Sequence, residues 1–417
     1  MKVLLKSATI VDPSSKHHLK KRDVLIEKGI IKKIAASISE PKAKVVDLPN
    51  LHISQGWFDS GVSLGEPGYE ERENLDNGLQ TAALSGFAEI AINPNSNPVP
   101  DTKSHVKYLK SKSEAHAVTA HVVGALTSKG KGIDLAEIYD MHSEGAISFY
   151  DYKKPIIHPN LLKIALQYAQ NFGGLVQSFP MEPDVAHKGV ANENVNSTKL
   201  GLNGIPSLSE ELQMVRDLYI LEYTGGKLHI PNISTAKSVE LIKDAKKKGL
   251  QVSCSVSVNN LTLTDDVLES FDTNYKLMPP LRTSKDNAAL LKGLKDGVID
   301  GVTSDHDPMD VEHKRTEFDH ASFGSIGLES CLGALLTVMD VELAVKSLIG
   351  LKKVFGLEEH LISEGTQANL SLFNPKLEKE FSDKDIHSTS KNSAQLGRKL
   401  KGVPYGIYNN GQLVING

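Results

Sequence analysis

The sequence predicts an α/β protein, a distorted (β/α)8 TIM barrel with a small β-sandwich domain formed by the N- and C-terminal segments. Eight short apolar runs lie between residues 57 and 355, and helical patterns fill most of the intervals. The 417 residues also exceed the roughly 250 that one such barrel needs. We therefore place the barrel at residues 54–355 and the composite β-sandwich at residues 1–53 and 356–417.

The two ends of the chain read as strands separated by polar or turn-forming segments. The first 53 residues contain the runs KVLLKSATIVD, RDVLIEKGIIKKIA and AKVVDL. Near the other end, ANLSLFNP is followed by a segment in which Asn410-Gly411 is a strong hairpin signal. We expect both ends to form one domain, with the barrel inserted between them.

The clearest barrel unit covers residues 227–258. A strand runs to about Asn232, Ser234 or Thr235 caps a helix with one apolar face, and Gly249 ends that helix before the next strand. Two long connections, 182–207 and 306–327, follow strand C-termini. Because active sites of such barrels are built on that face, both connections are candidates for lids or partner surfaces.

Composition excludes several classes of function. Hydrophobic residues make up 40% and charged residues 24%, as in ordinary globular proteins, and the net charge of -4 indicates no nucleic-acid partner. No apolar stretch approaches the roughly 20 residues of a membrane span. The two cysteines are too few for a disulfide framework, and the N-terminus lacks a signal-peptide pattern. We therefore expect a cytoplasmic protein without a nucleic-acid or membrane partner.

Chemistry in such a barrel falls on residues at the C-terminal ends of the strands. The residues at these positions are Asp59, Gly61, Ser63, Asn93, Asn95, Asp151, Phe179, Asn232, Asn259, Asn260, Asp305, His306 and Asp307. A hydrolytic zinc site needs about three histidine or carboxylate ligands. Gly61 and Phe179 supply none, and asparagine is a weak ligand. Most of the fifteen histidines lie elsewhere, and His229, within the sixth predicted strand, remains a candidate.

Several motifs resemble the dihydroorotase family of the amidohydrolase superfamily, of the bacterial type associated with aspartate transcarbamoylase. The matching segments, in the order and spacing of the family, are FDSGVSLGEPGYEERE, INPNSNPVPDT, ISFYDYKKP, HIPNISTAKSVELI, TNYKLMPPLR, DGVIDGVTSDHDP and FGSIGLES. They cover nearly the whole chain. The resemblance implies an amidohydrolase-like barrel and a place in de novo pyrimidine biosynthesis.

The chain departs from the family pattern at the positions that carry its chemistry. The metal-ligand positions of the resemblance hold Gly61, Ser63, Asp151, Phe179 and Asn232. Only Asp151 is retained among them, and its acidic partner position holds Tyr152. An arginine and an asparagine that would bind substrate are replaced by Gly65 and Met278. The resemblance further implies that Asn95 is a retained substrate-binding position and Asp305 a retained general base, which we expect to be idle.

These departures predict a dihydroorotase-like pseudoenzyme without a metal cofactor. The resemblance implies that such a protein acts as a structural subunit for aspartate transcarbamoylase, and we expect a homo-oligomer. Two alternatives stay open. One is an active dihydroorotase or related cyclic-amide hydrolase with a rebuilt site, which would use zinc and the residues Asp151, Asp305, His306 and Asp307. The other is a metabolite-binding protein that holds a small carboxylic acid through Asn95.

Overall fold

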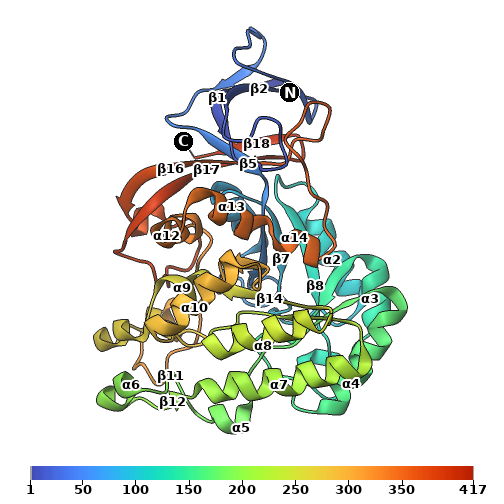
Figure 1. Cartoon of the computed structure of the whole chain (residues 1–417), viewed down its shortest axis with the longest axis vertical. Helices are drawn as coiled ribbons and strands as arrows, with labels where there is room; N and C mark the ends of the chain where they lie inside the picture. The colour runs from blue at the N-terminus through green and yellow to red at the C-terminus, as the bar shows by residue number, and fades with distance from the viewer. Residues whose placement is uncertain (1, 417) are drawn as a thin grey trace.

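The computed structural model describes residues 2–416 and contains a parallel barrel and a second, separate sheet (Figure 1). The barrel strands follow the order β15-β14-β13-β10-β9-β8-β7-β6. Their bounds are β6 (Trp57–Val62), β7 (Phe87–Ile92), β8 (Thr119–Gly124), β9 (Ala146–Phe149), β10 (Leu175–Gln177), β13 (Lys227–Ile230), β14 (Val252–Ser257) and β15 (Gly301–Thr303). The barrel is closed just past β15, where Ser63 N donates to His306 O at 2.8 Å. The predicted fold class is confirmed.

Helices cover the outside of the barrel. The main ones are α1 (Leu75–Leu84), α2 (Lys103–Ser113), α3 (Ile138–Glu144), α4 (Pro159–Ala169), α7 (Ser207–Thr224), α8 (Ala236–Lys247), α10 (Ser284–Lys295) and α13 (Val341–Ile349). Helix α8 forms as the sequence predicts: the Thr235 side chain accepts from Ser238 N, and Ile242 and Ala245 are buried. Gly249, with φ +83°, lies in the left-handed region just past the helix, where glycine is favoured.

The second sheet combines strands from both ends of the chain in the order β18-β17-β16-β5-β1-β2-β3, with β4 paired to β1. The strands are β1 (Lys2–Ile10), β2 (Lys21–Glu27), β3 (Ile30–Ala35), β4 (Lys44–Val46), β5 (His52–Gln55), β16 (Leu370–Glu380), β17 (Lys399–Asn409) and β18 (Gln412–Ile415). The antiparallel pair β5–β16, with Ile53 opposite Leu372, joins the two ends around one apolar core. Asn410 and Gly411 both have positive φ, as the tight hairpin turn between β17 and β18 requires.

Shorter elements lie in the connections between the main helices and strands. They are α5 (Pro183–Ala186), β11 (Ala191–Asn192), α6 (Val195–Leu200), β12 (Gly204–Ile205), α9 (Val258–Thr262), α11 (Val311–Lys314), α12 (Cys331–Val338) and α14 (Leu351–Val354), with 3-10 turns at Ser128–Gly130, Gln170–Phe172, Asp265–Ser270, Thr273–Tyr275 and Asp383–Asp385. No helix within residues 2–416 has the length and apolar character needed to cross a membrane.

The connection at residues 306–327 is held down by two buried lysines. Lys314 Nζ donates to the carbonyls of Ser322 and Gly324, each at 3.0 Å. Lys276 Nζ donates to the Phe318 carbonyl at 2.8 Å and also to that of Asp319. Because the ammonium groups satisfy backbone carbonyls of the loop, this connection is a fixed structure above β15.

A buried ion pair ties the opposite end of the barrel to the second sheet. Glu89 on β7 accepts from Lys352 Nζ on α14 at 2.7 Å and from the amide of Asn369, just before β16, at 3.0 Å. Its other oxygen lies 2.9 Å from His121 Nε2 on β8. Burial alone would raise the pKa of Glu89, but the contacts with His121 and Lys352 lower it to about 2.

Candidate functional site

Asp59, the third residue of β6, forms hydrogen bonds that hold the barrel together. One of its carboxylate oxygens accepts hydrogen bonds from Thr303 Oγ1 on β15 and, at 2.9 Å, from Gly61 N. The other accepts from Ser304 N at 3.0 Å. The carboxylate therefore joins β6 to β15, where the barrel closes.

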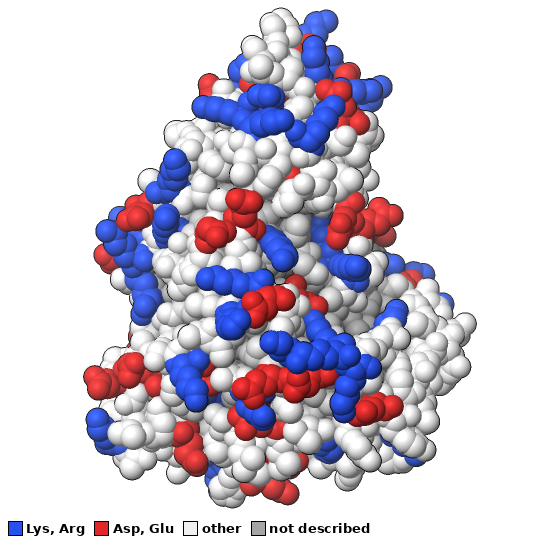
Figure 2. Space-filling view, viewed as in Figure 1, with Lys and Arg blue, Asp and Glu red and all other residues white. Residues whose placement is uncertain are grey.

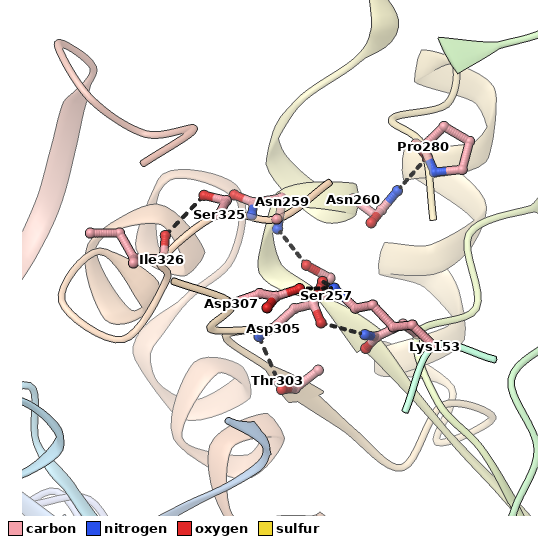
Figure 3. Close-up of polar contacts among 12 residues, drawn as sticks. Lys153, Ser257, Asn259, Asn260, Pro280, Thr303, Asp305, Asp307, Ser325 and Ile326 are labelled. Atoms are coloured by element: carbon pink, nitrogen blue, oxygen red, sulfur yellow. Dashed lines mark hydrogen bonds and ion pairs between the residues drawn. The ribbon is translucent and has the colours of Figure 1, made fainter. Parts of the chain in front are cut away.

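The centre of the barrel mouth is an ion-paired cluster built around Lys153 (Figure 3). Lys153, four residues past β9, places Nζ 3.2 Å from Asp305 Oδ2 and 3.1 Å from Asp307 Oδ2. Asn232, after β13, donates its amide to the other oxygen of Asp305 at 2.9 Å. The side chains of Lys153, Asp305 and Asp307 are only 11%, 8% and 3% exposed. Both oxygens of Asp305 are therefore engaged by side chains of the chain itself.

Three residues of this cluster have backbone conformations in the left-handed region. Lys153, Asn232 and Asp305 have φ values of 51°, 54° and 50°, in the left-handed region that residues with a Cβ seldom occupy. Each such residue costs on the order of 1 kcal/mol and persists where its surroundings determine its conformation. Three strained residues, from three different strand ends, meet in one ion-paired contact.

The charges at the barrel mouth partly offset one another, because one ammonium group, that of Lys153, faces the two carboxylates of Asp305 and Asp307. Burial raises the pKa of Asp305 to about 6, and Asp307 adds to this rise while Lys153 opposes it. For Lys153, burial alone would lower the pKa, but the two carboxylates raise it above its ordinary value. Lys153 therefore stays charged at neutral pH, and its ammonium group supplies the positive charge that faces the carboxylates.

The positions that the family resemblance marks as metal ligands do not fit a zinc ion. A Cβ added at Gly61 would lie 2.2 Å from Thr303 Oγ1, so the site as folded has no room for a side chain there. Phe179 is buried in an apolar cluster, and Asn232 uses its amide as a donor to Asp305. Within the described chain, no group of three or more His, Cys, Asp or Glu side chains is placed to hold a metal. Zinc sites draw three or four such ligands.

Asp151 and Asn95 lie together, but their contacts differ from those of Asp305. Asp151 accepts hydrogen bonds from the backbone N–H groups of Leu126 and Thr127, at 3.1 and 3.0 Å, and from the Thr127 hydroxyl. Burial nevertheless raises the pKa of Asp151 above its ordinary value. Asn95, Asp151 and Tyr152 line a cavity of about 130 Å³. This cavity is the part of the predicted site that remains hollow.

Gly65 and Met278, at positions that the family resemblance marks as substrate-binding, pack closely against other parts of the chain. A Cβ added at Gly65 would lie 1.9 Å from the Tyr69 carbonyl oxygen, so the loop packs against the space an arginine would need. Met278 packs with the apolar cluster that contains Phe179. Ser63 Oγ and Tyr152 Oη are buried without a hydrogen-bond partner among residues 2–416.

The other polar residues that the sequence marks as candidates form hydrogen bonds within the protein. His229, inside the barrel, lies 2.9 Å from Ser253 Oγ, and burial lowers its pKa to about 3, so the ring is neutral. His306 accepts from the backbone of the loop after β15 through Nδ1. Asn260 donates to the Pro280 carbonyl at 2.9 Å, and Asn259 accepts from Gln395.

Sequence reasoning missed Lys153, the residue that organises the cluster. The one feature of the sequence that could have indicated a site role for Lys153 is its position, two residues past Asp151 in the connection after the fourth barrel strand. The partners of Lys153 are 152 and 154 residues away in the sequence. No local pattern could therefore indicate the ion pairs.

The barrel with its second sheet is a fold that this chain shares with solved hydantoinase structures. An L-hydantoinase (dihydropyrimidinase) from Arthrobacter aurescens superimposes with a TM-score of 0.84 at 21% identity, over 99% of this chain and 96% of that chain. A D-hydantoinase structure also gives a TM-score of 0.84, at 20% identity, over 100% of this chain and 95% of that chain. At these identities, the likeness shows the shared fold.

The sequence comparisons are more specific. A family model described as dihydro-orotase-like matches residues 52–238. A dihydroorotase from Pelotomaculum thermopropionicum is 36% identical over 422 aligned residues, covering 100% of this chain and 99% of the relative. A dihydroorotase from Geotalea daltonii is 36% identical, covering 97% of this chain and 96% of the relative. The chain belongs to the dihydroorotase family.

Proposed function

We propose that this chain is a non-catalytic dihydroorotase-family protein of pyrimidine biosynthesis, which acts in the cytoplasm as a structural subunit for aspartate transcarbamoylase. The observation that carries the proposal is the Lys153 ammonium group, ion-paired with Asp305 and Asp307 in the barrel mouth. Asp305 stands at the general-base position of the family resemblance. There it is bonded to a fixed cation of the protein.

The chemistry of ring opening explains why this arrangement argues against catalysis. Hydrolysis of a cyclic amide needs a water activated near neutral pH, and a metal centre does this by lowering the pKa of its bound water to about 7. Gly61 and Phe179 provide no ligand for such a centre, and Lys153 holds the carboxylates that remain beside it. An ammonium group is a point charge with donors only, so it cannot take over the role of a metal-bound hydroxide.

A role as an active hydrolase has one observation in its favour. The pKa of Asp305, raised by burial to about 6, lies within the range of useful general bases. A base alone does not supply an activated nucleophile, so we rank this alternative second. The metabolite-binding alternative would use the cavity beside Asn95, but its 130 Å³ falls below the roughly 300 Å³ at which ligand pockets begin.

The partner part of the proposal rests on the family resemblance and is tested by reconstitution. The purified chain and the aspartate transcarbamoylase of the same cell are mixed at about 20 µM and separated by size exclusion with light scattering. We expect one species heavier than either protein alone. Dihydroorotase activity is assayed in the same fractions. Separate elution would contradict the subunit role, and dihydroorotate hydrolysis by the chain alone would contradict the non-catalytic role.

A further inference from the structure

A cavity of about 430 Å³ lies between the barrel and the second sheet. Its walls come from the end of α1, from the segment that precedes α12, and from the facing parts of β16 and β17. Helix α12 packs on β17, and Figure 1 shows it just below β16 and β17 in the view. The volume falls within the roughly 300–1,000 Å³ of small-molecule sites. Lys153, Asp305 and Asp307 do not line this cavity, so it is distinct from the barrel mouth.

Two buried polar atoms at this cavity have no hydrogen-bond partner within residues 2–416. They are Glu329 Oε2 and Ser85 Oγ, and both residues line the cavity. Glu329 is 8% exposed and Ser85 is 2% exposed. A buried carboxylate oxygen without a donor has lost its hydration and gained no hydrogen bond, so native structures seldom contain one. The two atoms therefore indicate a polar group that is supplied from outside the chain.

The structural role of Glu329 uses its other oxygen. Oε1 accepts from Ser388 N at 3.0 Å and from Ser388 Oγ at 2.6 Å. This contact holds the carboxylate in one orientation and leaves Oε2 unused, as in a site whose binding group is fixed in advance. The ligand group that matches a fixed carboxylate oxygen is a cation with N–H donors, such as an ammonium group.

A positive charge without a partner lies at the same cavity. Lys384 is exposed and lines the cavity, and it forms no ion pair with any residue in the described part of the chain. The neighbouring Lys379, in contrast, is ion-paired with Asp385. Figure 2 shows basic and acidic side chains intermixed along the left edge of the molecule, close to β16 and β17. A ligand that satisfies both Glu329 and Lys384 carries a positive group and a negative group.

Much of the remaining wall is apolar. Phe381, just past β16, and Leu400 of β17 are 3% and 5% exposed, and Pro404 of β17 is also buried. Tyr405 lines the cavity too, but its hydroxyl donates to the Pro49 carbonyl at 2.8 Å and is already engaged. These side chains match a hydrocarbon or aromatic group on the ligand, because burying apolar surface against them is favourable.

We propose that this cavity binds a free α-amino acid with a large apolar side chain. The ammonium group of the ligand donates to Glu329 Oε2 and Ser85 Oγ, and its carboxylate faces Lys384. Its side chain packs against Phe381 and Leu400. A free amino acid fits better than a segment of a partner protein, because the unpaired acceptor atoms are enclosed and a small molecule can enter whole. The site is independent of the chemistry at the barrel mouth and of the proposed subunit role.

A thermal-shift screen of the full chain identifies the ligand. The amino acids L-leucine, L-isoleucine, L-methionine and L-phenylalanine are each added at about 10 mM. At least one should raise the unfolding midpoint, because a ligand that binds only the folded chain stabilises it. Calorimetric titration with that amino acid should show one saturable site per chain. Failure of all four to bind, or equally tight binding of L-aspartate, would overturn the proposal.

Analogues of the bound amino acid test each charged contact without a change in the protein. The N-acetylated form lacks the ammonium group that Glu329 accepts from, and the decarboxylated amine lacks the group that faces Lys384. Each should bind about tenfold more weakly or worse, because hydrogen bonds between charged groups are the strong ones. Binding of the N-acetylated form as tightly as the free amino acid would overturn the proposed recognition.

Variants place the binding in this cavity. Glu329→Gln keeps an acceptor for Ser388 and removes the charge, and Lys384→Met removes the unpaired cation. Both should weaken binding about tenfold or more. Lys401→Met, at an exposed residue of β17 that does not line the cavity, is the matched control and should bind as the natural chain does.

The unfolding midpoint without ligand checks that each variant is folded. If Glu329→Gln does not fold, Ser85→Ala and the exposed Lys384→Met test the same site. Affinity equal to that of the natural chain in both of these variants would overturn the proposal. Equal weakening by Lys401→Met would overturn it as well, because the loss would then not depend on the cavity.

Discussion

Lys153 Nζ lies 3.2 Å from Asp305 Oδ2, inside the mouth of the barrel and almost out of contact with solvent. The two residues come from the ends of the fourth and eighth barrel strands, which are far apart in the sequence. Each adopts a left-handed backbone conformation to make the contact. This ion pair, shared with Asp307, occupies the place at which the family resemblance locates catalysis.

Removing the Lys153 charge should destabilise the fold. In Lys153→Met, Asp305 and Asp307 stay buried without their cation, which costs about 3–5 kcal/mol in comparable buried pairs. Lys154→Met is the neighbouring control, because the residue is exposed, its Nζ donates to the Gly130 carbonyl, and its charge acts on Asp151 and is not part of the Lys153 ion pair. Urea unfolding followed by fluorescence measures both. Equal midpoints for the two variants would show that the ion pair carries no stability.

Restoring a single histidine should not restore a metal site. In Gly61→His, the new Cβ meets Thr303 Oγ1 at 2.2 Å, so the end of β15 must shift before the ring can enter. We expect a lower unfolding midpoint and no hydrolysis, and only weak zinc binding even with Ser63→His added, because ligands act cooperatively. Zinc retained after dialysis is measured by mass spectrometry, with Ser63→His alone as control. Dihydroorotate hydrolysis by either single-histidine variant would contradict this prediction.

The ion pair at the other end of the barrel predicts an acid-sensitive contribution to stability. The folded pKa of Glu89, about 2, is below its ordinary value of 4.5, so its contribution is present above pH 4.5 and is lost as pH falls toward 2. Lys352→Met should lower stability at neutral pH by about 3–5 kcal/mol. It should also weaken the loss between pH 4.5 and 2. If Lys352→Met left the pH dependence of the urea midpoint unchanged, the acid sensitivity would not come from the Glu89–Lys352 ion pair.

His229 predicts a second pH window. Its folded pKa of about 3 is below the ordinary value of 6.5, because burial disfavours the charged ring. The unfolded chain therefore binds more protons between these values, and stability is lost as pH falls from 6.5 toward 3. His229→Gln should remove this loss between pH 6.5 and 5, where Glu89 does not titrate and where Asp305, with its pKa raised to about 6, changes stability in the opposite direction. A profile as steep as that of the natural protein would assign the acid sensitivity to other groups.

Local signals explain why the fold could be predicted from the sequence. Thr235 and Gly249 mark the two ends of α8, and Asn410-Gly411 marks a hairpin, because each acts on its own backbone. That Gly61 and Phe179 offer no metal-binding side chain was likewise visible, since it depends only on residue type. The contacts of Lys153 were not visible in the sequence, because they join segments more than 150 residues apart.

The sequence does not show which face of α7 is exposed. The exposed face carries Leu208, Leu212, Val215, Tyr219 and Tyr223. Its apolar residues have helical spacing, and such a pattern ordinarily indicates the face that packs on the core. The core side carries the buried Met214, Leu218 and Leu221. It also carries Glu210 and Asp217, whose carboxylates accept hydrogen bonds from serines on other segments. Both faces of α7 carry apolar residues at helical spacing, so the packing of the helix decides which of them is buried.

The most direct test of the non-catalytic account measures metal content and dihydroorotate hydrolysis on the same purified sample. The protein is produced in zinc-supplemented medium, dialysed without chelator and assayed beside an active dihydroorotase relative prepared in the same way. The account predicts zinc well below one per chain and hydrolysis at the background rate, with Lys153 still paired to Asp305. Close to one zinc per chain together with turnover near that of the relative would contradict it.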